Sequence, residues 1–555
     1  MTVKKTFDYI IVGGGSAGCV LANRLSEQNT VLLVEAGPGD KSWKVRMPAA
    51  TALAIADERR NWHYETEPQV HLNNRRLIWP RGRMLGGCSS HNLMVYIRGH
   101  AGDYDHWRQL GCRGWAYRDV LPYFKRAESF SPRPSEYRGH QGPMQLKVSS
   151  DDNPLIELFI KAVQEAGFPR TDSFSASQLE GVGRFDLNII SGNRLDTGRA
   201  YLWDVMERKS LSLELNAYAN RLIFEGTTAV GLEYRKEGWV KQARASREVI
   251  VCAGAINTPQ LLMLSGIGDP VHLAEVGIAP LVEITGVGKN LQDHLDVAIQ
   301  RECTKPVSLY KNMPTYRRAL IGLEWLIKGT GQGATGHSEA GAFLRINESA
   351  DRPEVQNHFL PMVIRRGNRW PTFHGYQINV CQLRQESRGF VKLRSSVAHD
   401  HPIIEPNYLQ MEADVRCMRE GVRLTREIMV QPAFDSVRGA ELMPGDGTKS
   451  DEDIDAFVRE RSETCYHPCG TSKMGSDRDE TAVVDPALRV RGVDQLRIAD
   501  ASIMPTIISA NLNATAIMIG EKAADLILGR APLPAEDVSV ATPIARQPPA
   551  RLVGV

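Results

Sequence analysis

The N-terminal part of the chain alternates apolar runs with a glycine-rich turn and an acidic residue. An apolar run covers residues 7–12, three glycines follow, a helical pattern continues to Ser26, and a second apolar run over residues 30–34 ends at Glu35. Short apolar runs bounded by turn signals are typical of buried strands. The pattern therefore predicts a strand, a tight turn, a helix, a second strand and a terminal carboxylate.

Apolar runs of the same kind return much later in the chain. Residues 248–253 and 496–500 form mainly apolar, strand-like runs that lead into small residues, so we interpret both as further strands of the first sheet. Residues 353–408 instead alternate β-branched or aromatic residues with polar ones and contain turn signals. This alternation is typical of an antiparallel sheet, which we expect in a second domain.

These patterns predict two domains whose segments interleave. The expected fold is an α/β, Rossmann-like nucleotide-binding domain interleaved with an α+β substrate domain that is built on an antiparallel sheet. We assign residues 1–150, 208–300 and 462–530 to the first domain and residues 151–207 and 301–461 to the second. Residues 531–555 contain five prolines and no apolar periodicity, which predicts a flexible tail.

Composition narrows the range of partners and locations. The 555 residues carry a net charge of +2, which gives no indication of nucleic-acid binding. No apolar run is long enough to span a bilayer and no signal-peptide pattern opens the chain, so we expect a cytoplasmic location, with peripheral contact at the inner membrane left open. The nine cysteines are scattered and odd in number, which indicates reduced thiols.

The glycine turn has the G-x-G-x-x-G spacing of a dinucleotide-binding fingerprint, formed by Gly13, Gly15 and Gly18. Gly13 permits the tight turn, and Gly15 lets backbone N–H groups approach a pyrophosphate at the helix N-terminus, where Ser16 stands. Gly18 lets the helix pack closely on the strand, and Glu35 is placed to accept hydrogen bonds from a ribose. A plain glycine-rich turn is the alternative, but the agreement of strand, helix and acid favours dinucleotide binding.

A second glycine-rich loop covers residues 81–92. Glycines and short polar side chains let the backbone approach a flat or charged ligand closely, whereas the alternative is an ordinary turn. Because the fingerprint is already present, we favour the cofactor interpretation. The candidate cofactor-binding residues of this loop are Arg83, Gly87, Ser90, His91 and Asn92.

Capping patterns predict three helix starts. Thr258 followed by Pro259 predicts a helix that begins at this pair, and Ser450 followed by three acidic residues predicts another. Asn513 is expected to cap a helix over residues 514–528, whose N-terminus favours negative charge on a bound ring system.

His467 is a candidate for acid–base chemistry. Pro468 restricts its backbone, as a positioned catalytic side chain requires, although a histidine in a turn is commonly structural. Cys465 and Cys469 flank it like metal ligands, but no second ligand pair accompanies them, so no metal site is predicted.

In this order, these segments resemble the glucose-methanol-choline (GMC) oxidoreductases, a family of FAD-dependent alcohol dehydrogenases and oxidases. The resemblance covers residues 7–530, with the two family signatures at residues 82–92 and 254–268. It implies that the first domain binds FAD. The glycine fingerprint alone predicts a dinucleotide but does not distinguish FAD from NAD.

The resemblance also implies roles for single residues. His467 matches the active-site histidine, and Asn511 matches its partner, which hydrogen-bonds the developing alkoxide. A primary alcohol would then be oxidised to the aldehyde by hydride transfer to flavin N5, with a quinone, another electron carrier or O2 as final acceptor. The positions that match flavin contacts are Asp500, Ala501, Asn513 and Ala514.

His91 departs from the commoner family pattern. Many relatives have an aliphatic residue there, whereas the run from Gly86 to Asn92 resembles members in which this histidine is joined covalently to FAD. Two interpretations remain open: a covalent His91–FAD bond, or a histidine that only packs beside the ring.

The sequence leaves more than one possibility open for the substrate and for the class of reaction. Residues 61–62, 287–294 and 338–341 look like the branch of choline dehydrogenases and aliphatic alcohol dehydrogenases. Glu339 either faces a cationic substrate or is a structural carboxylate. Two alternative hypotheses for the function are a flavin-containing hydroxynitrile-type lyase and a non-catalytic flavoprotein.

Overall fold

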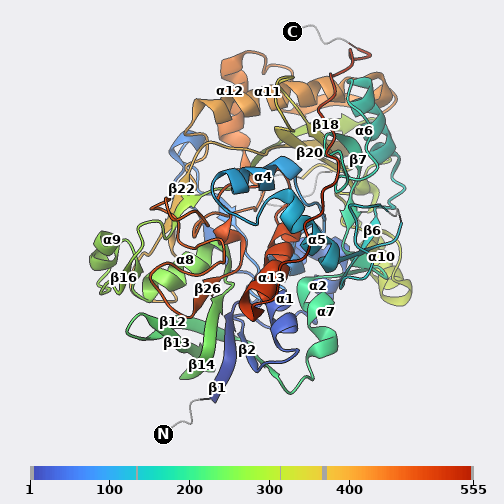
Figure 1. Cartoon of the computed structure of the whole chain (residues 1–555). Coiled ribbons are helices and arrows are strands. Elements are labelled where there is room, and N and C mark those ends of the chain that lie inside the picture. Colours follow the sequence, from blue (N-terminus) through green and yellow to red (C-terminus); the bar gives the residue numbers. More distant parts are fainter. Residues whose placement is uncertain (1–4, 133–134, 313, 365–371, 552–555) are drawn as a thin grey trace.

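A computed structural model describes residues 5–132, 135–312, 314–364 and 372–551 (Figure 1). Its first sheet contains five parallel strands in the order β11 (Leu211–Glu214), β2 (Val31–Val34), β1 (Lys5–Val12), β14 (Trp239–Val251) and β26 (Leu496–Ile498). The hairpin of β12 (Ala217–Glu225) and β13 (Thr228–Lys236) adds antiparallel strands beside β14. The four strands predicted from apolar runs are therefore confirmed.

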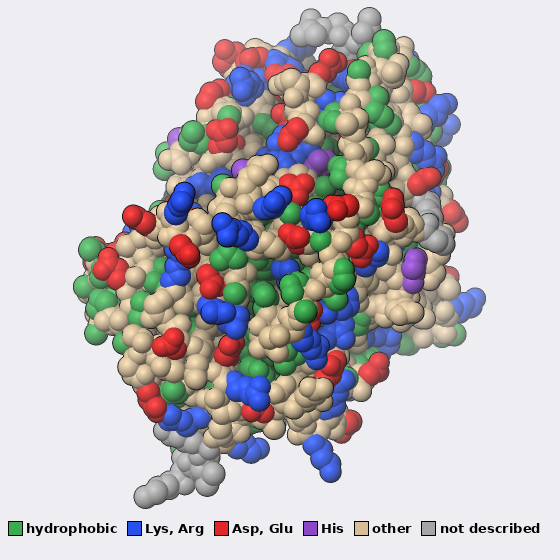
Figure 2. Space-filling view, viewed as in Figure 1, with side chains coloured by type: hydrophobic (Ala, Val, Ile, Leu, Met, Phe, Trp, Pro, Cys, Tyr) green, Lys and Arg blue, Asp and Glu red, His purple; other side chains and the backbone are tan. Residues whose placement is uncertain are grey.

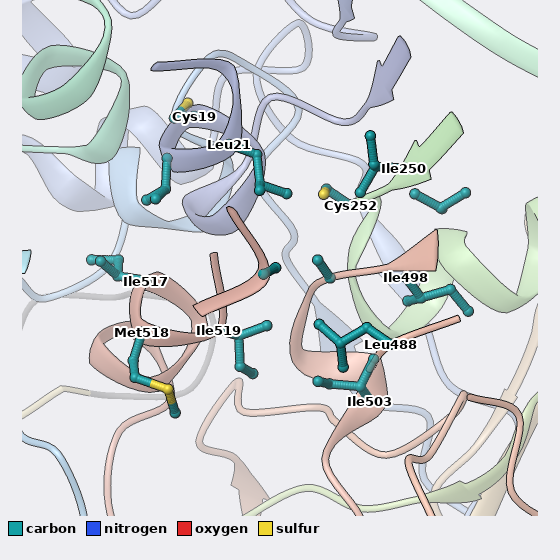
Figure 3. Packing of buried hydrophobic residues seen from close by; sticks show 14 of the residues in the cluster. Cys19, Leu21, Ile250, Cys252, Leu488, Ile498, Ile503, Ile517, Met518 and Ile519 are labelled. Carbon is teal, nitrogen blue, oxygen red and sulfur yellow. The ribbon is translucent and has the colours of Figure 1, made fainter. Parts of the chain in front are cut away.

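Two helices cover this sheet and bury its apolar runs. Helix α1 (Ser16–Leu25) packs against α13 (Asn513–Leu528), although the two are almost five hundred residues apart. Figure 3 shows side chains of both helices, including Leu21 and Ile519, gathered with Ile250 and Ile498 of the sheet. All four side chains are fully buried, so the core of this half is made by segments from both ends of the chain.

The second sheet is antiparallel and lies at the opposite end of the molecule (Figure 1). Its order is β24 (Arg438–Met443), β18 (Leu295–Cys303), β21 (Gly375–Gln382), β20 (Val355–Leu360), β19 (Ala340–Leu344) and β7 (Gly181–Arg184), and β25 (Glu463–Thr464) also pairs with β18. Helices α6 (Pro154–Glu165), α11 (Glu412–Met429) and α12 (Asp451–Arg461) pack around it. Phe159 of α6 stacks on Phe359 of β20 with ring centroids 4.8 Å apart.

The alternating pattern of residues 353–408 therefore contributes to antiparallel sheets as expected, but to two of them. Strands β20 and β21 belong to the large sheet, while β22 (Gly389–Lys392) and β23 (Ile403–Glu405) form a small sheet with β17 (Lys289–Leu291). Residues 365–371 of this stretch lie outside the described residues. The exact limits of the two domains stay a prediction.

The remaining helices connect the two sheets or lie at the edges of the molecule. They are α2 (Trp43–Arg46), α3 (Thr51–Ile55), α4 (Ala101–Gln109), α5 (Tyr117–Ala127), α7 (Thr197–Tyr201), α8 (Gly254–Leu264), α9 (Pro270–Glu275) and α10 (Thr315–Lys328).

Two of the predicted helix starts are wrong and one is confirmed. Helix α8 begins at Gly254, so Pro259 lies inside the helix, and the Thr258 hydroxyl donates to Asp500 instead of capping. The N-cap of α13 is Leu512, so Asn513 is the first helical residue. Ser450 caps α12 as predicted, with its hydroxyl accepting from the Asp453 N–H.

The C-terminal segment has no helix or strand over residues 531–551. It runs along the surface beside α6 (Figure 1), and its backbone N–H groups donate to carbonyls of the body, from Glu536 to Arg118 and from Ala541 to Ser177. The segment that was predicted to be a flexible tail is thus hydrogen-bonded to the rest of the protein at several places along its length. Residues 552–555 lie outside the described residues.

Basic and acidic side chains are interspersed on the face shown in Figure 2. Within the described ranges, no helix is long and apolar enough to cross a membrane. The same residues contain no group of three or more His, Cys, Asp or Glu side chains that could hold a metal ion. All nine cysteines fall within the described ranges and are free thiols.

Candidate functional site

A cavity of about 1380 Å³ is lined by residues of both sheets. Gly13 and Glu35 contribute from the ends of β1 and β2, while Asp296 of β18 and Asn379 of β21 contribute from the antiparallel sheet. Pockets for a single small ligand typically have volumes of roughly 300–1,000 Å³. The cavity is therefore large enough for a dinucleotide together with a small substrate.

The glycine turn leaves open space at the start of α1. Gly13 has φ +104°, a conformation that glycine adopts without strain, and a Cβ on Gly18 would lie 1.9 Å from the Gly13 carbonyl oxygen. A Cβ on Gly15 would meet no atom closer than 3.9 Å, and Gly15 lines the cavity. No side chain caps α1, so its first N–H groups are available to an anionic ligand.

Glu35 is fixed at the end of β2 by the backbone around it. Its carboxylate accepts hydrogen bonds from the N–H groups of Gly14 and Gly37, both at 2.8 Å, and it lines the cavity. Burial raises the pKa of Glu35 to about 7, against the lowering effect of these two hydrogen bonds. The remaining lone pairs of the carboxylate can accept from a ribose, as the sequence predicts.

The predicted residues of the loop at 82–92 divide into two groups. Gly87, His91 and Asn92 line the cavity. Arg83 lies outside its wall and donates toward the carbonyl oxygens of Arg59 and Glu58, at 3.3 and 3.4 Å. Ser90 also lies outside the wall, since its hydroxyl donates to the Leu85 carbonyl oxygen at 2.7 Å.

The second group of predicted contacts surrounds the start of α13. Asp500, Ala501 and Asn513 line the cavity, whereas Ala514 does not. The carboxylate of Asp500 accepts from the Gly254 N–H at 2.9 Å and from the Ser502 N–H at 2.7 Å, which ties α8 to the end of β26. The side-chain carbonyl of Asn513 accepts from the Ser16 hydroxyl at 2.8 Å, so the two helix starts meet.

Two buried nitrogen atoms in the cavity wall lack a hydrogen-bond partner within the described part of the chain. His91 Nδ1 and Asn513 Nδ2 form no hydrogen bond with any described residue. Burial lowers the pKa of His91 to about 3, so its imidazole is neutral and one ring nitrogen remains free to bond. Unpaired buried polar atoms are unfavourable, and a bound polar ring system in the cavity would remove this cost. The wall therefore fits a flavin dinucleotide.

His467 and Asn511 meet on the same cavity wall. Asn511 Nδ2 lies 3.2 Å from His467 Nε2, and Asn511 Oδ1 accepts from Gln356 Nε2 at 3.3 Å, which fixes the orientation of the amide. The backbone N–H of His467 donates to Asp293 Oδ1 at 2.6 Å, which holds the turn that carries the imidazole. The sequence-predicted catalytic pair is thus brought together.

A chain of hydrogen bonds determines which nitrogen of His467 carries the proton. His294 Nε2 lies 3.1 Å from the carbonyl oxygen of Leu383, which can only accept, so this nitrogen is protonated. Neutral His294 therefore offers Nδ1 as an acceptor to His467 Nδ1, 3.0 Å away. His467 then carries its proton on Nδ1, and its Nε2 lone pair points toward Asn511 and the cavity.

Electrostatics keep this base unprotonated at neutral pH. Burial, followed by the neighbouring His294, lowers the pKa of His467 well below its usual value of 6.5. Burial also lowers the pKa of His294 to about 3. A neutral imidazole beside an amide N–H donor can accept a hydroxyl proton while the amide stabilises the oxygen left behind.

Four further residues contribute to this site and were not predicted from the sequence as functional. His294 and Asp293 position His467, Gln356 orients Asn511, and Asp296 places a buried carboxylate in the wall. Asp293 and His294 lie in the run over residues 287–294, which resembles the choline dehydrogenase branch, whereas Asp296 and Gln356 lie outside it.

Glu339 does not face the cavity. Its side chain is buried, accepts from the Ser149 hydroxyl at 2.5 Å and from the Gly336 N–H at 3.1 Å, and lies outside the wall. Of its two predicted interpretations, the structure supports the structural carboxylate.

Comparison with protein families gives two matches. Sequence models described as GMC oxidoreductase match residues 7–296 and residues 385–520.

Known proteins resemble the chain over nearly its whole length. It is 48% identical to the mitochondrial choline dehydrogenase of Homo sapiens, over 97% of this chain and 92% of that protein. It is 47% identical to the oxygen-dependent choline dehydrogenase of Brucella ovis, over 95% and 96% of the two chains.

Solved structures share the fold. Pyridoxine 4-oxidase from Mesorbium loti has a TM-score of 0.86 and 31% identity, over 94% of this chain and 99% of that chain. A variant of formate oxidase from Aspergillus oryzae has a TM-score of 0.89 and 27% identity, over 95% and 99%.

Proposed function

Because the chain belongs to the GMC oxidoreductase family and is an FAD-dependent enzyme acting on CH–OH donors, we propose that it oxidises a primary alcohol to the aldehyde with His467 as the base. The observation that carries this proposal is the His467–Asn511 pair, which shares one cavity with the nucleotide-binding turn. A binding module would need neither a base nor an alkoxide donor.

Each residue has a defined task in the proposed reaction. Bound FAD supplies the hydride acceptor. The α1 N-terminus and Gly15 would hold its pyrophosphate, and Glu35 would hold its ribose. His467 Nε2 takes the hydroxyl proton of the alcohol, while an amide N–H of Asn511 donates to the oxygen as negative charge develops there.

Anaerobic mixing of the loaded enzyme with a panel of alcohols tests this function. A primary alcohol is expected to bleach the flavin absorbance, and air or a soluble quinone then identifies the acceptor by restoring the colour. If no alcohol bleached a fully loaded, folded protein, the proposed reaction would be refuted. Cleavage of a cyanohydrin without bleaching would point to the lyase alternative.

A second, narrower candidate is choline or a similar cationic alcohol. Relatives that match the whole chain are named choline dehydrogenases, and Asp296 offers a carboxylate in the cavity wall, 9% exposed. Its Oδ2 accepts from Asn379 Nδ2 at 2.8 Å, and burial raises the pKa of Asp296 to about 7. A quaternary ammonium group would pair with the ionised form, and Trp62 and Tyr466 add aromatic faces to the wall.

Asp296→Asn separates a cationic from a neutral substrate. With choline we expect kcat/KM to fall at least about thirtyfold, the factor that corresponds to losing ~2 kcal/mol of a buried charge pair. With 3,3-dimethylbutan-1-ol, which has the same shape without the charge, kcat/KM should change little. Steady-state kinetics with both alcohols provides the matched comparison, and an equal loss for both would remove Asp296 from charge recognition.

We also propose that His91 is joined covalently to FAD. An unprotonated ring nitrogen would bond to the 8α-carbon of the flavin, a C–H bond of that methyl group would break with loss of a proton, and the two electrons released would pass to the flavin ring and from there to the electron acceptor of the proposed reaction. Support comes from its unpaired Nδ1 in the cavity wall and from its neutral imidazole, since only an unprotonated nitrogen can form such a bond. Acid precipitation should leave the yellow colour on the polypeptide, and a peptide containing His91 should carry the mass of FAD. His91→Ala should release the flavin on denaturation and alter its reduction potential.

The alternative for His91 predicts the opposite partition of colour. If freshly purified, fully loaded protein lost all its flavin to the supernatant, His91 would be only a neighbour of the ring. The family assignment would be unaffected.

A further inference from the structure

Helix α10 presents an apolar stripe to solvent. In any α-helix, residues at positions i, i+4, i+7 and i+11 lie on the same face. In α10 these are Tyr316, Leu320, Leu323 and Ile327, with exposed fractions of 62, 60, 51 and 70%. Leu326 extends the stripe and is 73% exposed. A contiguous exposed apolar surface in an otherwise well-packed enzyme indicates an interaction site.

The stripe is not needed for folding, because the opposite face of α10 attaches the helix. Trp325 is buried, and its Nε1–H donates to the Gly192 carbonyl oxygen at 2.8 Å. It packs in a small cluster with Met47 and Ala50, and Ile321 packs against the same cluster. The outward residues can therefore be changed without opening this core.

Basic side chains flank the stripe at both ends. Within α10 the charged residues are Arg317, Arg318 and Lys328 against Glu324 alone, and all four are exposed. Lys311, also exposed, precedes the helix, and its carbonyl oxygen accepts from Arg317 Nη1 at 2.9 Å. An apolar face bordered by cations complements a bilayer that carries anionic headgroups.

We propose that α10 is a membrane-surface anchor that inserts its apolar stripe into a bilayer containing anionic phospholipid. Its 14 residues give a length of about 21 Å, and the helix lies along the surface of the protein at the right-hand edge of Figure 1. Such a helix lies in the interfacial plane, with the apolar face among the acyl chains and the basic residues among the headgroups.

A second copy of this chain fits the surface less well. Arg317 and Arg318 lie at one end of α10 and Lys328 at the other, so antiparallel pairing of two such helices would place cation against cation. Parallel pairing would do the same at each end, and Glu324 alone cannot neutralise them. Charge therefore opposes self-association and favours an anionic surface.

The anchor lies close to the catalytic cavity. Its attachment cluster includes Ala50, directly before α3, and Thr51 and Ile55 of α3 line the cavity. Leu53 on the same helix is 50% exposed. Docking through α10 would therefore bring this side of the cavity toward the bilayer.

Vesicle flotation of the FAD-loaded enzyme tests the anchor and does not depend on the proposed reaction. We expect binding to vesicles of phosphatidylcholine with phosphatidylglycerol and much weaker binding to phosphatidylcholine alone. The triple variant Leu320→Glu, Leu323→Glu and Ile327→Glu should bind the anionic vesicles at least about tenfold more weakly. Flavin content and thermal unfolding should match those of the wild type, since all three side chains point outward.

A matched control changes equally exposed apolar residues elsewhere. Trp239 and Val240, 74 and 57% exposed, lie in the β13–β14 hairpin far from α10 in Figure 1. Trp239→Glu with Val240→Glu should leave vesicle binding unchanged. The anchor is refuted if the wild type does not float, if the triple variant floats equally well, or if the triple variant instead converts a dimer to a monomer in analytical ultracentrifugation.

Discussion

Replacing His467 by alanine is expected to slow anaerobic reduction of the flavin by about two to four orders of magnitude, the usual contribution of a positioned acid–base group. The reason is geometric: the hydrogen-bond chain from Leu383 through His294 leaves the Nε2 lone pair of His467 facing Asn511 and the cavity. Stopped-flow absorbance with a saturating alcohol measures the rate, and the variant should remain folded and yellow.

The pH dependence of the wild type provides an independent check of the same base. Protonated His467 cannot accept a proton, and burial lowers its pKa well below 6.5. The reductive rate should therefore stay level as the pH falls through 6.5 and decline only at more acidic pH, where the imidazole becomes charged. Near-normal reduction in His467→Ala would exclude this residue from proton transfer.

Asn511→Ala should lower the reductive rate by about 10²–10³, the effect of removing one hydrogen-bond donor to a developing oxyanion. The amide donor lies 3.2 Å from the base, and its orientation is fixed by Gln356, so alanine removes the donor without replacing it. FAD content should stay close to that of the wild type, because Asn513 and Asp500 form the neighbouring contacts of the cavity wall.

The variant Asn511→Asp sharpens this test, since it keeps the size of the side chain but replaces the donor by an anion. It should be at least as slow as alanine, because a carboxylate repels a developing alkoxide. Flavin absorbance per polypeptide separates the two possible roles. A variant that loses FAD but reduces the remaining flavin at the normal rate would assign Asn511 to structure.

Local sequence patterns were sufficient for most of the first sheet. Apolar runs at residues 7–12 and 248–253 form β1 and β14 because strands buried on both faces read as continuous apolar segments. The glycine fingerprint predicted that Gly18 lets the helix pack closely, and a Cβ on Gly18 would indeed lie 1.9 Å from the Gly13 carbonyl oxygen at the end of β1. Helix starts were less predictable, since the Thr258 hydroxyl is used by Asp500, a partner 242 residues away.

The sequence by itself determined the family and the glycine turn, and it predicted His467 and Asn511 as the catalytic pair, because motifs are local and a resemblance carries residues one by one. Only the tertiary structure decided the proton position on His467, since it depends on His294, 173 residues away. It also decided that Asp296 rather than Glu339 faces the cavity.

Helix α10 also shows the difference between what the sequence determines and what the tertiary structure decides. Its apolar periodicity alone would predict a buried face, yet the stripe through Leu320 and Ile327 points outward while Trp325 points in. Periodicity fixes which side chains share a face. Which face is covered depends on segments that are distant in sequence, such as the cluster around Met47, and so follows only from the folded chain.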